Sequence, residues 1–205
     1  MGIYSKKPAF TLIELLIVVA IIAVLAAIAV PNFLEAQTRA KVSRSKSDMR
    51  SMDAALEAYC VDHDQYPPYG RIAPDDSVQY PARVNNMYDK MCFIGPQITT
   101  PIAYVTSWAL DPFATHFKGA PAMKEIEYLN LDQHVANFPT PPPPWAGQLI
   151  PAWGRWRLTA AGPDGDRGLD IKQNCVYDPS NGTVSNGDIV RCQRFGESQI
   201  NPAAP

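Results

Sequence analysis

The sequence predicts an α+β protein in which a long N-terminal hydrophobic helix continues into a small globular domain with a short antiparallel β-sheet and a proline-rich irregular region. Three observations support this. Residues 10–30 are apolar except for Thr11 and Glu14. Residues 31–63 keep a helical period of apolar positions. Most of the 20 prolines follow residue 64, which disfavours long regular elements there.

Residues 10–30 have the length of a membrane-spanning helix. At about 1.5 Å per residue the segment measures roughly 30 Å, the thickness of a bilayer's hydrocarbon core. Glu14 is its unusual member, because a carboxylate inside such a run costs on the order of 2.5–3.5 kcal/mol on insertion scales. Two simpler interpretations are open. A plain membrane anchor would keep Glu14 near the interface, and a secretory signal would be cleaved at Ala27-Ile28-Ala29.

The segment from Lys6 to Glu14, KKPAFTLIE, and the apolar run after it resemble the class III signal of type IV pilins and type II secretion pseudopilins. In that family a prepilin peptidase removes a short basic leader, residues 1–9 here, and methylates the new amino terminus, which would be Phe10. Ala9 stands where the family usually has glycine. The resemblance implies a subunit that polymerises through its N-terminal helix, as a type II secretion pseudopilus or a type IV pilus.

The same resemblance makes Glu14 the fifth residue of the mature chain and an assembly residue. In a filament core its carboxylate would pair with the amino-terminal cation of Phe10, because an unpaired buried charge is strongly destabilising. The resemblance also implies an inner-membrane assembly platform and minor pilins as partners. It implies a single-pass bacterial inner-membrane state in contact with lipid, with domain 64–205 outside the cytoplasm, and afterwards a periplasmic or cell-surface filament.

Residues 31–63 form the amphipathic continuation of the helix. Pro31 predicts a kink. Ser45 interrupts the apolar seam, which favours packing against a sheet over a dimeric coiled coil. The helix is expected to end near His63, before the diproline at 67–68. The apolar seam of this segment consists of Val42, Met49, Met52, Leu56 and Tyr59.

A basic run opens the second half of this helix, and only Asp48 opposes it. The positive-inside rule alone would keep the adjoining domain in the cytoplasm, whereas the leader resemblance places it outside. The run is either a solvated helix face or a surface that attracts phospholipid headgroups before assembly and acidic surfaces of neighbouring subunits afterwards. Its members are Arg39, Lys41, Arg44, Lys46 and Arg50.

Beyond the helix the elements are expected to be short. Residues 91–94, 102–108 and 153–159 have the composition of strands. Residues 139–144, PTPPPP, favour an exposed polyproline II loop. Residues 176–177 and 189–191 flank two Asn-Gly pairs, which are strong tight-turn signals, and this predicts antiparallel pairing near the end of the chain.

Asp164, Asp166 and Asp170 lie in a glycine-rich loop. Ca²⁺ takes six to eight oxygens, including carbonyls that glycine turns can direct inward. Type II major pseudopilins bind calcium in a loop near this position, so the resemblance also points to Ca²⁺. Cys175 occupies the position where an EF-hand loop has its distal glutamate, and a metal-free Asx turn is the alternative. Asp188 is a weaker fourth candidate.

The four cysteines contain no C-x-x-C pair, which speaks against a zinc or thioredoxin-like site. In an oxidising compartment they allow three connectivities. We favour Cys175 with Cys192, which would close a terminal loop, and hence Cys60 with Cys92. Four reduced, buried thiols are the alternative. The terminal loop resembles type IV pilins, whereas the aspartates resemble type II major pseudopilins.

Catalysis and nucleic-acid binding have little support. The net charge of −2 argues against a nucleic-acid partner for the domain as a whole. The three histidines are scattered, and no phosphate-cradling loop or nucleophile elbow is found. A non-enzymatic filament subunit is therefore favoured. The competing class is a membrane-anchored or secreted extracytoplasmic module that binds calcium or another ligand and does not polymerise.

Overall fold

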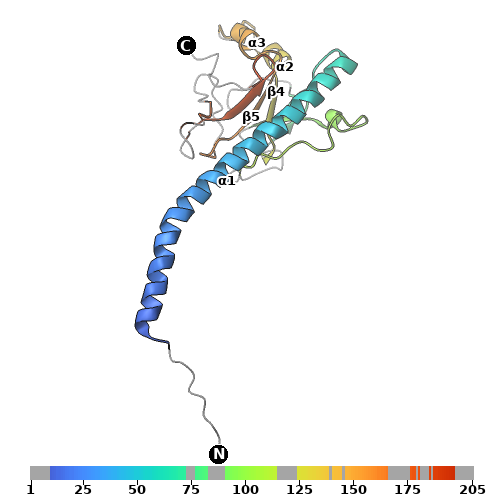
Figure 1. Cartoon of the computed structure of the whole chain (residues 1–205). Helices are drawn as coiled ribbons and strands as arrows, with labels where there is room; N and C mark the ends of the chain where they lie inside the picture. The colour runs from blue at the N-terminus through green and yellow to red at the C-terminus, as the bar shows by residue number, and fades with distance from the viewer. Residues whose placement is uncertain are drawn as a thin grey trace, which may run out of the picture.

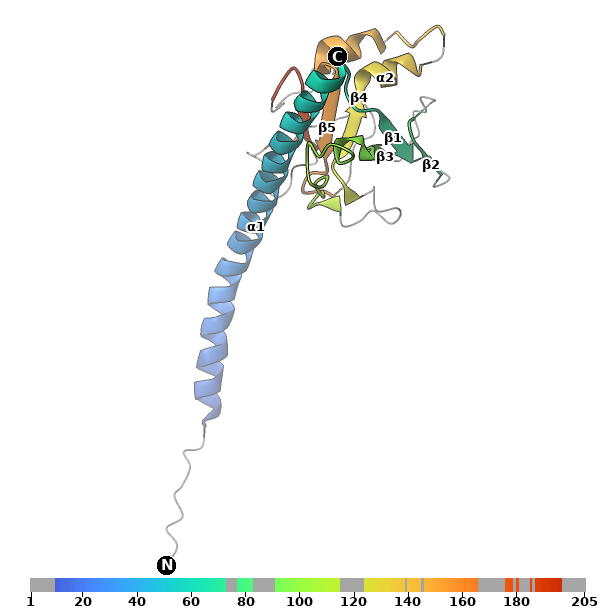
Figure 2. The ribbon, with the colours of Figure 1, turned by 90° about the vertical axis from the view of Figure 1, so that its right-hand side faces the viewer.

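The structure is a computed structural model that describes residues 10–72, 77–82, 91–114, 124–138, 140–144, 146–165, 176–178, 180, 185 and 187–196. A single long helix, α1 (Leu12–His63), carries a domain on its second half (Figures 1 and 2). In its described residues, the domain contains two three-stranded antiparallel sheets. The predicted α+β class with a long N-terminal helix is confirmed.

The first sheet has the order β2-β1-β3 and the second β4-β5-β6. Among the described residues, the short helices α2 and α3 and the 3₁₀ turns η1 and η4 lie between the strands. The strands of the first sheet are β1 (Tyr69–Ile72), β2 (Val78–Gln79) and β3 (Met91–Ile94). Those of the second are β4 (Glu127–Asn130), β5 (Trp156–Ala160) and β6 (Ile189–Cys192). The connecting elements are η1 (Pro96–Ile98), α2 (Leu131–Ala136), η4 (Ala146–Gln148) and α3 (Leu149–Trp153).

Helix α1 ends where the sequence predicts. Asp64 caps it in the left-handed conformation, with φ of 56°. Pro31 lies inside the helix without ending it. Figure 1 shows that the helix axis bends between its apolar half and the half that contacts the domain. A proline that removes one backbone hydrogen bond accounts for such a bend.

The predicted seam of α1 is its buried face. All five seam residues are buried, and Leu56 is 0% exposed. They pack beside β6 and η1, so packing against a sheet is confirmed. Ser45 is also fully buried here, and its hydroxyl has no hydrogen-bond partner in the structure. Ser45, the polar interruption of the seam, is therefore buried in the core.

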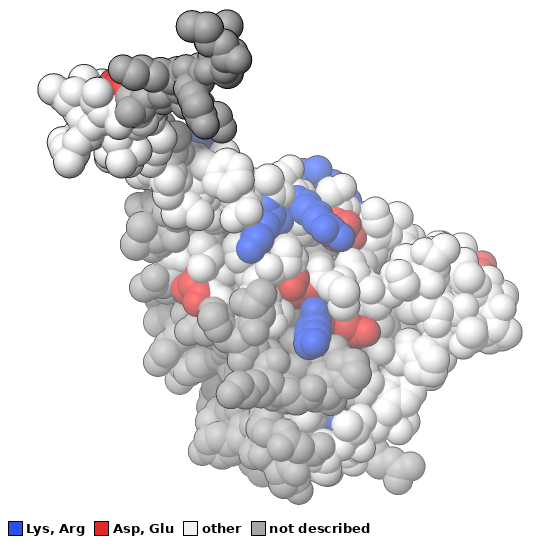
Figure 3. Space-filling model, turned by 90° about the horizontal axis from the view of Figure 1, so that it is seen from below, with Lys and Arg blue, Asp and Glu red and all other residues white. Residues whose placement is uncertain are grey.

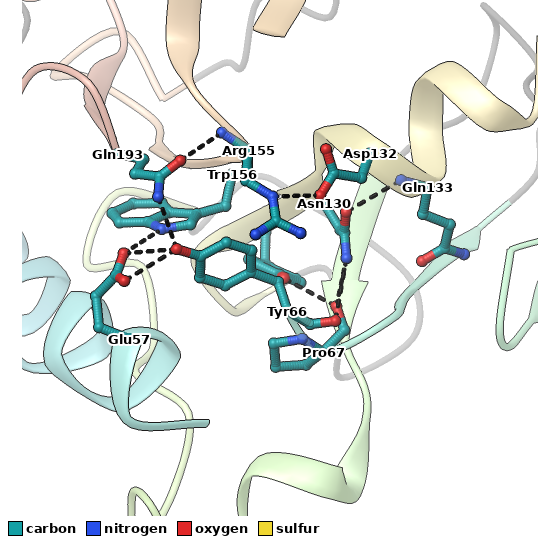
Figure 4. A network of polar contacts seen from close by, with 10 residues as sticks. Glu57, Tyr66, Pro67, Asn130, Asp132, Gln133, Arg155, Trp156 and Gln193 are labelled. Carbon is teal, nitrogen blue, oxygen red and sulfur yellow. Dashed lines mark hydrogen bonds and ion pairs between the residues drawn. The ribbon is translucent and has the colours of Figure 1, made fainter. Parts of the chain in front are cut away.

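A polar network joins α1 to the second sheet (Figure 4). The Glu57 carboxylate accepts hydrogen bonds from the Tyr66 hydroxyl at 2.9 and 3.0 Å and from Trp156 Nε1 at 2.9 Å. Asp53, one turn earlier, accepts from Arg191 Nη2 at 2.6 Å. Both contacts tie the helix to strands far along the chain. They fix the direction in which the apolar half of α1 leaves the domain.

Three strand predictions have different outcomes. Residues 91–94 form β3, as expected. The strand predicted at 153–159 begins only at Trp156, because Leu149–Trp153 is helical and Gly154, with φ of 85°, caps the end of that helix. The strand predicted at 102–108 is wrong. The amides of Tyr104 and Val105 donate to the Ile98 carbonyl instead of to a neighbouring strand.

The antiparallel pairing predicted near the end of the chain is present, but its partner is β5. Strand β6 pairs antiparallel with β5, while Val176 makes only a single parallel bridge with Asp188. Pairing with β5 buries Ile189 and Val190 in the main core, which a detached hairpin would leave in solvent. The Asn-Gly turn at 181–182 lies outside the described residues. Residues 140–144 of the proline-rich stretch form a largely exposed loop, as expected.

His134 on α2 predicts a pH dependence of domain stability. Burial, helped by the nearby Arg157 cation, lowers the pKa of His134 from 6.5 to about 4. Between these pH values the unfolded chain binds a proton that the native chain does not, so stability is lost as the pH falls from about 6.5 to about 4. In urea titrations across this range, His134→Gln should reduce the pH dependence of the unfolding free energy. An unchanged slope would contradict this assignment.

Candidate functional site

The first half of α1 is an uncovered apolar surface. Its large apolar side chains from Phe10 to Leu34 are 46–75% exposed. The helix is long and apolar enough to cross a membrane, and its most apolar stretch is not buried against the domain. Figures 1 and 2 show this half extending away from the domain in both views. A soluble chain rarely exposes so large an apolar area, which indicates a membrane or protein partner.

The single carboxylate of this surface belongs to a capping box at the start of α1. Glu14 Oε2 accepts hydrogen bonds from the Thr11 backbone amide at 2.9 Å and from the Thr11 hydroxyl at 2.7 Å. The Glu14 amide donates back to the Thr11 hydroxyl at 3.3 Å. The side chain thus satisfies helix-end donors, and its negative charge lies at the favourable end of the helix dipole.

This geometry leaves Glu14 able to bind a cation in addition to its two Thr11 donors. A carboxylate has about four lone-pair sites, and the capping box uses only part of them. The carboxylate lies against the backbone of Thr11, the residue after Phe10. In a chain cut before Phe10, the new ammonium group would therefore lie one residue before the Thr11 amide that Glu14 contacts. The T-x-x-E pattern from Thr11 to Glu14 is the sequence signature of such a capping box, so Thr11 is more than a polar exception in the apolar run.

The three aspartates predicted to bind calcium are only partly described by the structure. Asp164 is exposed in a turn followed by Gly165, with φ of 76°, while Asp166 and Asp170 lie outside the described residues. A side chain at Gly162 would collide with the Gly187 carbonyl, so this turn lies against the residue before the buried Asp188. In the part of the chain that the structure describes, no group of three candidate ligands gathers. Calcium binding stays a prediction.

The disulfide assignments also stay predictions. Cys60 on α1 and Cys92 on β3 are half-buried, and Cys192 on β6 is buried. No bond joins any two of these three described cysteines. Burial raises the pKa of the Cys192 thiol, which makes it a poor nucleophile. Its favoured partner, Cys175, lies outside the described residues, as does Ala9 of the predicted cleavage site.

The basic run of α1 is distributed around the helix. Arg39 pairs with Glu35, and Arg44 Nε lies 3.7 Å from an Asp48 oxygen. Lys41 Nζ lies 5.7 Å from the centre of the Phe113 ring. The structure adds a feature that the sequence did not reveal, a pocket of about 260 Å³ beside the helix. It is lined by Arg39, Val42, Ser43, Lys46, Arg50 and Tyr177.

Comparisons with known proteins agree with this site. Residues 4–30 match the family model of the prokaryotic N-terminal methylation motif. The chain is 42% identical over 83 residues to the type IV major pilin protein PilA of Myxococcus xanthus, a match that covers 39% of this chain and 38% of that pilin. It is 40% identical over 62 residues to the type II secretion system core protein G of Pseudomonas aeruginosa, covering 30% of this chain and 44% of that protein.

A third relative, the type IV major fimbrial protein FimA of Dichelobacter nodosus, is 48% identical over 58 residues, which are 28% of this chain and 37% of the relative. Each match thus spans less than half of the relative's length. No solved structure matches the chain. Through its methylation motif and the apolar helix that follows, the N-terminal part of the chain is similar to type IV pilins and type II secretion pseudopilins.

Proposed function

We propose that this chain is a non-enzymatic structural subunit that is cleaved before Phe10, methylated there by a prepilin peptidase, and polymerised through α1. The observation that carries the proposal is the uncovered apolar half of α1 with one capped carboxylate at its start. A plain anchor gains nothing from a charge in this position, whereas a subunit that packs helix against helix can use it to set axial register.

Before assembly, lipid covers the apolar half of α1. The subunit then lies in the inner membrane with Phe10 at the cytoplasmic face and the domain on the other side. On assembly the same surface packs against the helices of neighbouring copies. Ala20, Ala23 and Ala27 present small side chains at helical spacing, which lets backbones approach closely where there is no hydrophobic drive.

In the assembled state the Glu14 carboxylate pairs with the ammonium of Phe10, from its own or a neighbouring subunit. An inner-membrane assembly platform and minor pilins are the further partners of this scheme. The similarity to a type IV pilin and to a type II secretion core protein supports two destinations, a surface pilus or a periplasmic pseudopilus. Electron microscopy of the native polymer distinguishes them by length and location.

Mass spectrometry of the native amino terminus tests the proposal. The expected chain begins at Phe10 and carries one methyl group on its amine. An intact Met1 would instead identify a plain membrane anchor. A chain beginning at Val30 would identify a secreted module that binds calcium or another ligand and does not polymerise. Either of these two results would overturn the filament assignment.

Calcium is a separate proposal about the loop that contains Asp164, Asp166 and Asp170. These carboxylates are hard oxygen ligands of the kind that Ca²⁺ prefers. The position of the Asp164 turn against the segment of Asp188 supports an additional oxygen from that segment. If the loop binds Ca²⁺, saturating chelator should lower the melting temperature of the domain, and re-added Ca²⁺ should restore it. An unchanged melting temperature would exclude a structural calcium ion.

A further inference from the structure

Charges of opposite sign are separated along the second half of α1. Residues 35–50 contain five Lys or Arg and two acids, a net charge of +3. Residues 51–64 contain four acids and no Lys or Arg, a net charge of −4 with histidine neutral. Both segments belong to one helix that packs on the domain core, so the two charges have fixed positions. Such a helix is electrostatically complementary to a second copy displaced along its axis.

Two of the four acids have no role in holding α1 on the domain. Asp53 and Glu57 make the contacts to the second sheet described above, whereas Asp62 and Asp64 are exposed. Asp62 accepts a hydrogen bond from the Tyr104 hydroxyl at 2.8 Å. Within the described part of the chain, neither Asp62 nor Asp64 pairs with a Lys or Arg side chain. They lie at the end of the helix where its dipole favours cations, which points to a cation outside the subunit.

The two acids repeat the arrangement of two cations earlier in the helix. Asp62 follows Arg44 by 18 residues, and Asp64, the C-cap residue, follows Lys46 by the same number. Eighteen residues make about five turns and measure about 27 Å along the axis. Because successive residues turn by about 100°, Arg44 and Asp62 lie on one flank of the buried seam, and Lys46 and Asp64 lie on the other.

We propose that Asp62 and Asp64 of one subunit pair with the cations of a second copy that lies beside it, displaced by about 27 Å along the filament. Parallel copies side by side face each other with opposite flanks. The facing pairs are therefore Asp62 with Lys46 and Asp64 with Arg44, at displacements of about 24 and 30 Å. The long Lys and Arg side chains span the difference between these two values. This inference rests on the proposed polymerisation through α1.

The two ends of this helix segment are accessible to other copies. Figure 1 shows the far end of α1 reaching the edge of the domain opposite to the apolar half. Figure 3, viewed from below, shows Lys and Arg side chains exposed on the face of the domain from which the apolar half emerges. A copy displaced along the filament therefore brings the acidic end of one subunit beside the basic segment of the next.

The cations of the basic segment differ in their suitability for this contact. The Arg44 side chain is 76% exposed, and its Nε lies 3.7 Å from an Asp48 oxygen, which is longer than a hydrogen bond. Lys46 has a further interaction within the chain, so an acid of a second copy would be an added partner for it. Arg39 is already paired with Glu35 and is not part of the proposed contact.

The contact joins a different pair of neighbours from the one that Glu14 joins. A neighbour whose Phe10 ammonium meets Glu14 is displaced by about four residues, roughly 6 Å. The charged segments of α1 need a displacement of about 24–30 Å, so they join copies several steps apart along the polymer. One exposed ion pair contributes little, but this one recurs at every subunit. Because exposed pairs are screened by salt, filaments should become shorter as the ionic strength rises.

Carbodiimide coupling of purified filaments tests the contact directly, because this reagent joins a lysine amine to a carboxylate only where the two touch. Within one chain, Lys46 and Asp62 lie 16 residues, about 24 Å, apart on a continuous helix. A link between them can therefore form only between two chains. Mass spectrometry should find this link in wild-type filaments and not in subunits kept apart in detergent. Filaments without it, or links from Asp62 to a different protein, would overturn the proposal.

Charge reversal supplies the second test. Lys46→Glu and Asp62→Lys should each lower filament yield about tenfold or more, because like charges then meet between copies. The two changes combined should restore the yield to within about threefold of the wild type. The matched control combines Arg44→Glu with Asp62→Lys. It has the same net charge, but it exchanges residues of one flank, so its yield should stay as low as that of the single variants.

The melting temperature of each variant in detergent identifies any loss of yield that comes from unfolding. With unchanged melting temperatures, a combined Lys46→Glu and Asp62→Lys chain that assembles no better than the single variants would overturn the proposal. Equal rescue by both double variants would reveal a dependence on net charge alone and would overturn it as well. A wild-type chain that forms no polymer would overturn the proposed function itself, whereas filaments that tolerate every reversal would overturn this inference alone.

Discussion

Glu14→Gln is expected to abolish filaments while the subunit still enters the membrane. Glutamine at this position keeps the capping box with Thr11, so the change removes the charge and leaves the helix start intact. The Phe10 ammonium then loses its counter-ion in the filament core. Breaking one partner of a buried ion pair costs about 3–5 kcal/mol, which weakens subunit addition by a factor on the order of a hundred or more.

The measurement compares sheared filament yield with the amount of subunit in the membrane fraction. Glu35→Gln is the matched control, because Glu35 is an acid of the same helix that pairs with Arg39 at the surface beyond the apolar run. The control should assemble at nearly the wild-type level, since surface pairs contribute little. Wild-type yield from the Glu14→Gln chain would refute the pairing that sets filament register.

Leu56→Ala should cause a large loss of domain stability. The Leu56 side chain is 0% exposed in the seam that joins α1 to the domain core. Truncation leaves a cavity in this seam, and such changes cost about 2–5 kcal/mol. Since small domains have only about 5–15 kcal/mol in total, this is a large fraction. The melting temperature, followed by tryptophan fluorescence, is expected to fall by roughly 10 °C.

Val61→Ala supplies the comparison for this prediction. Val61 lies on the same helix but is 80% exposed, so its truncation should change the unfolding free energy by less than about 0.5 kcal/mol. Equal effects of the two substitutions would mean that α1 is not packed on the domain through the described seam. Tyrosine or tryptophan signals that melt separately from the helix would lead to the same conclusion.

The helix was readable from the sequence because its signals are local. The apolar run, the seam and the end near His63 each depend on residues a few positions apart. Strand signals were less dependable. Residues 102–108 have strand composition, yet the Tyr104 and Val105 amides find their acceptor at Ile98. Among the side chains that suggested a strand, Tyr104 and Val105 are partly buried against the core and Trp108 is buried in it.

The contacts that place the helix on the domain could not be read from the sequence. Glu57 and Trp156 are 99 residues apart, and Asp53 and Arg191 are 138 apart. The pocket beside α1 needs Tyr177 close to helix residues 39–50. No local pattern marks such pairs, because Asp, Glu and Arg are also common on solvated surfaces.

The sequence by itself determined the membrane-length helix, the acid at its start and the face that α1 buries, since a 3.6-residue period and one charge in an apolar run act over a few turns. The tertiary structure decided that β6 joins β5, that Glu57 and Asp53 tie the helix to that sheet, and that three cations border one pocket. These features depend on which distant segments pack against one another and bury apolar surface. That is decided only when the whole hydrophobic core forms.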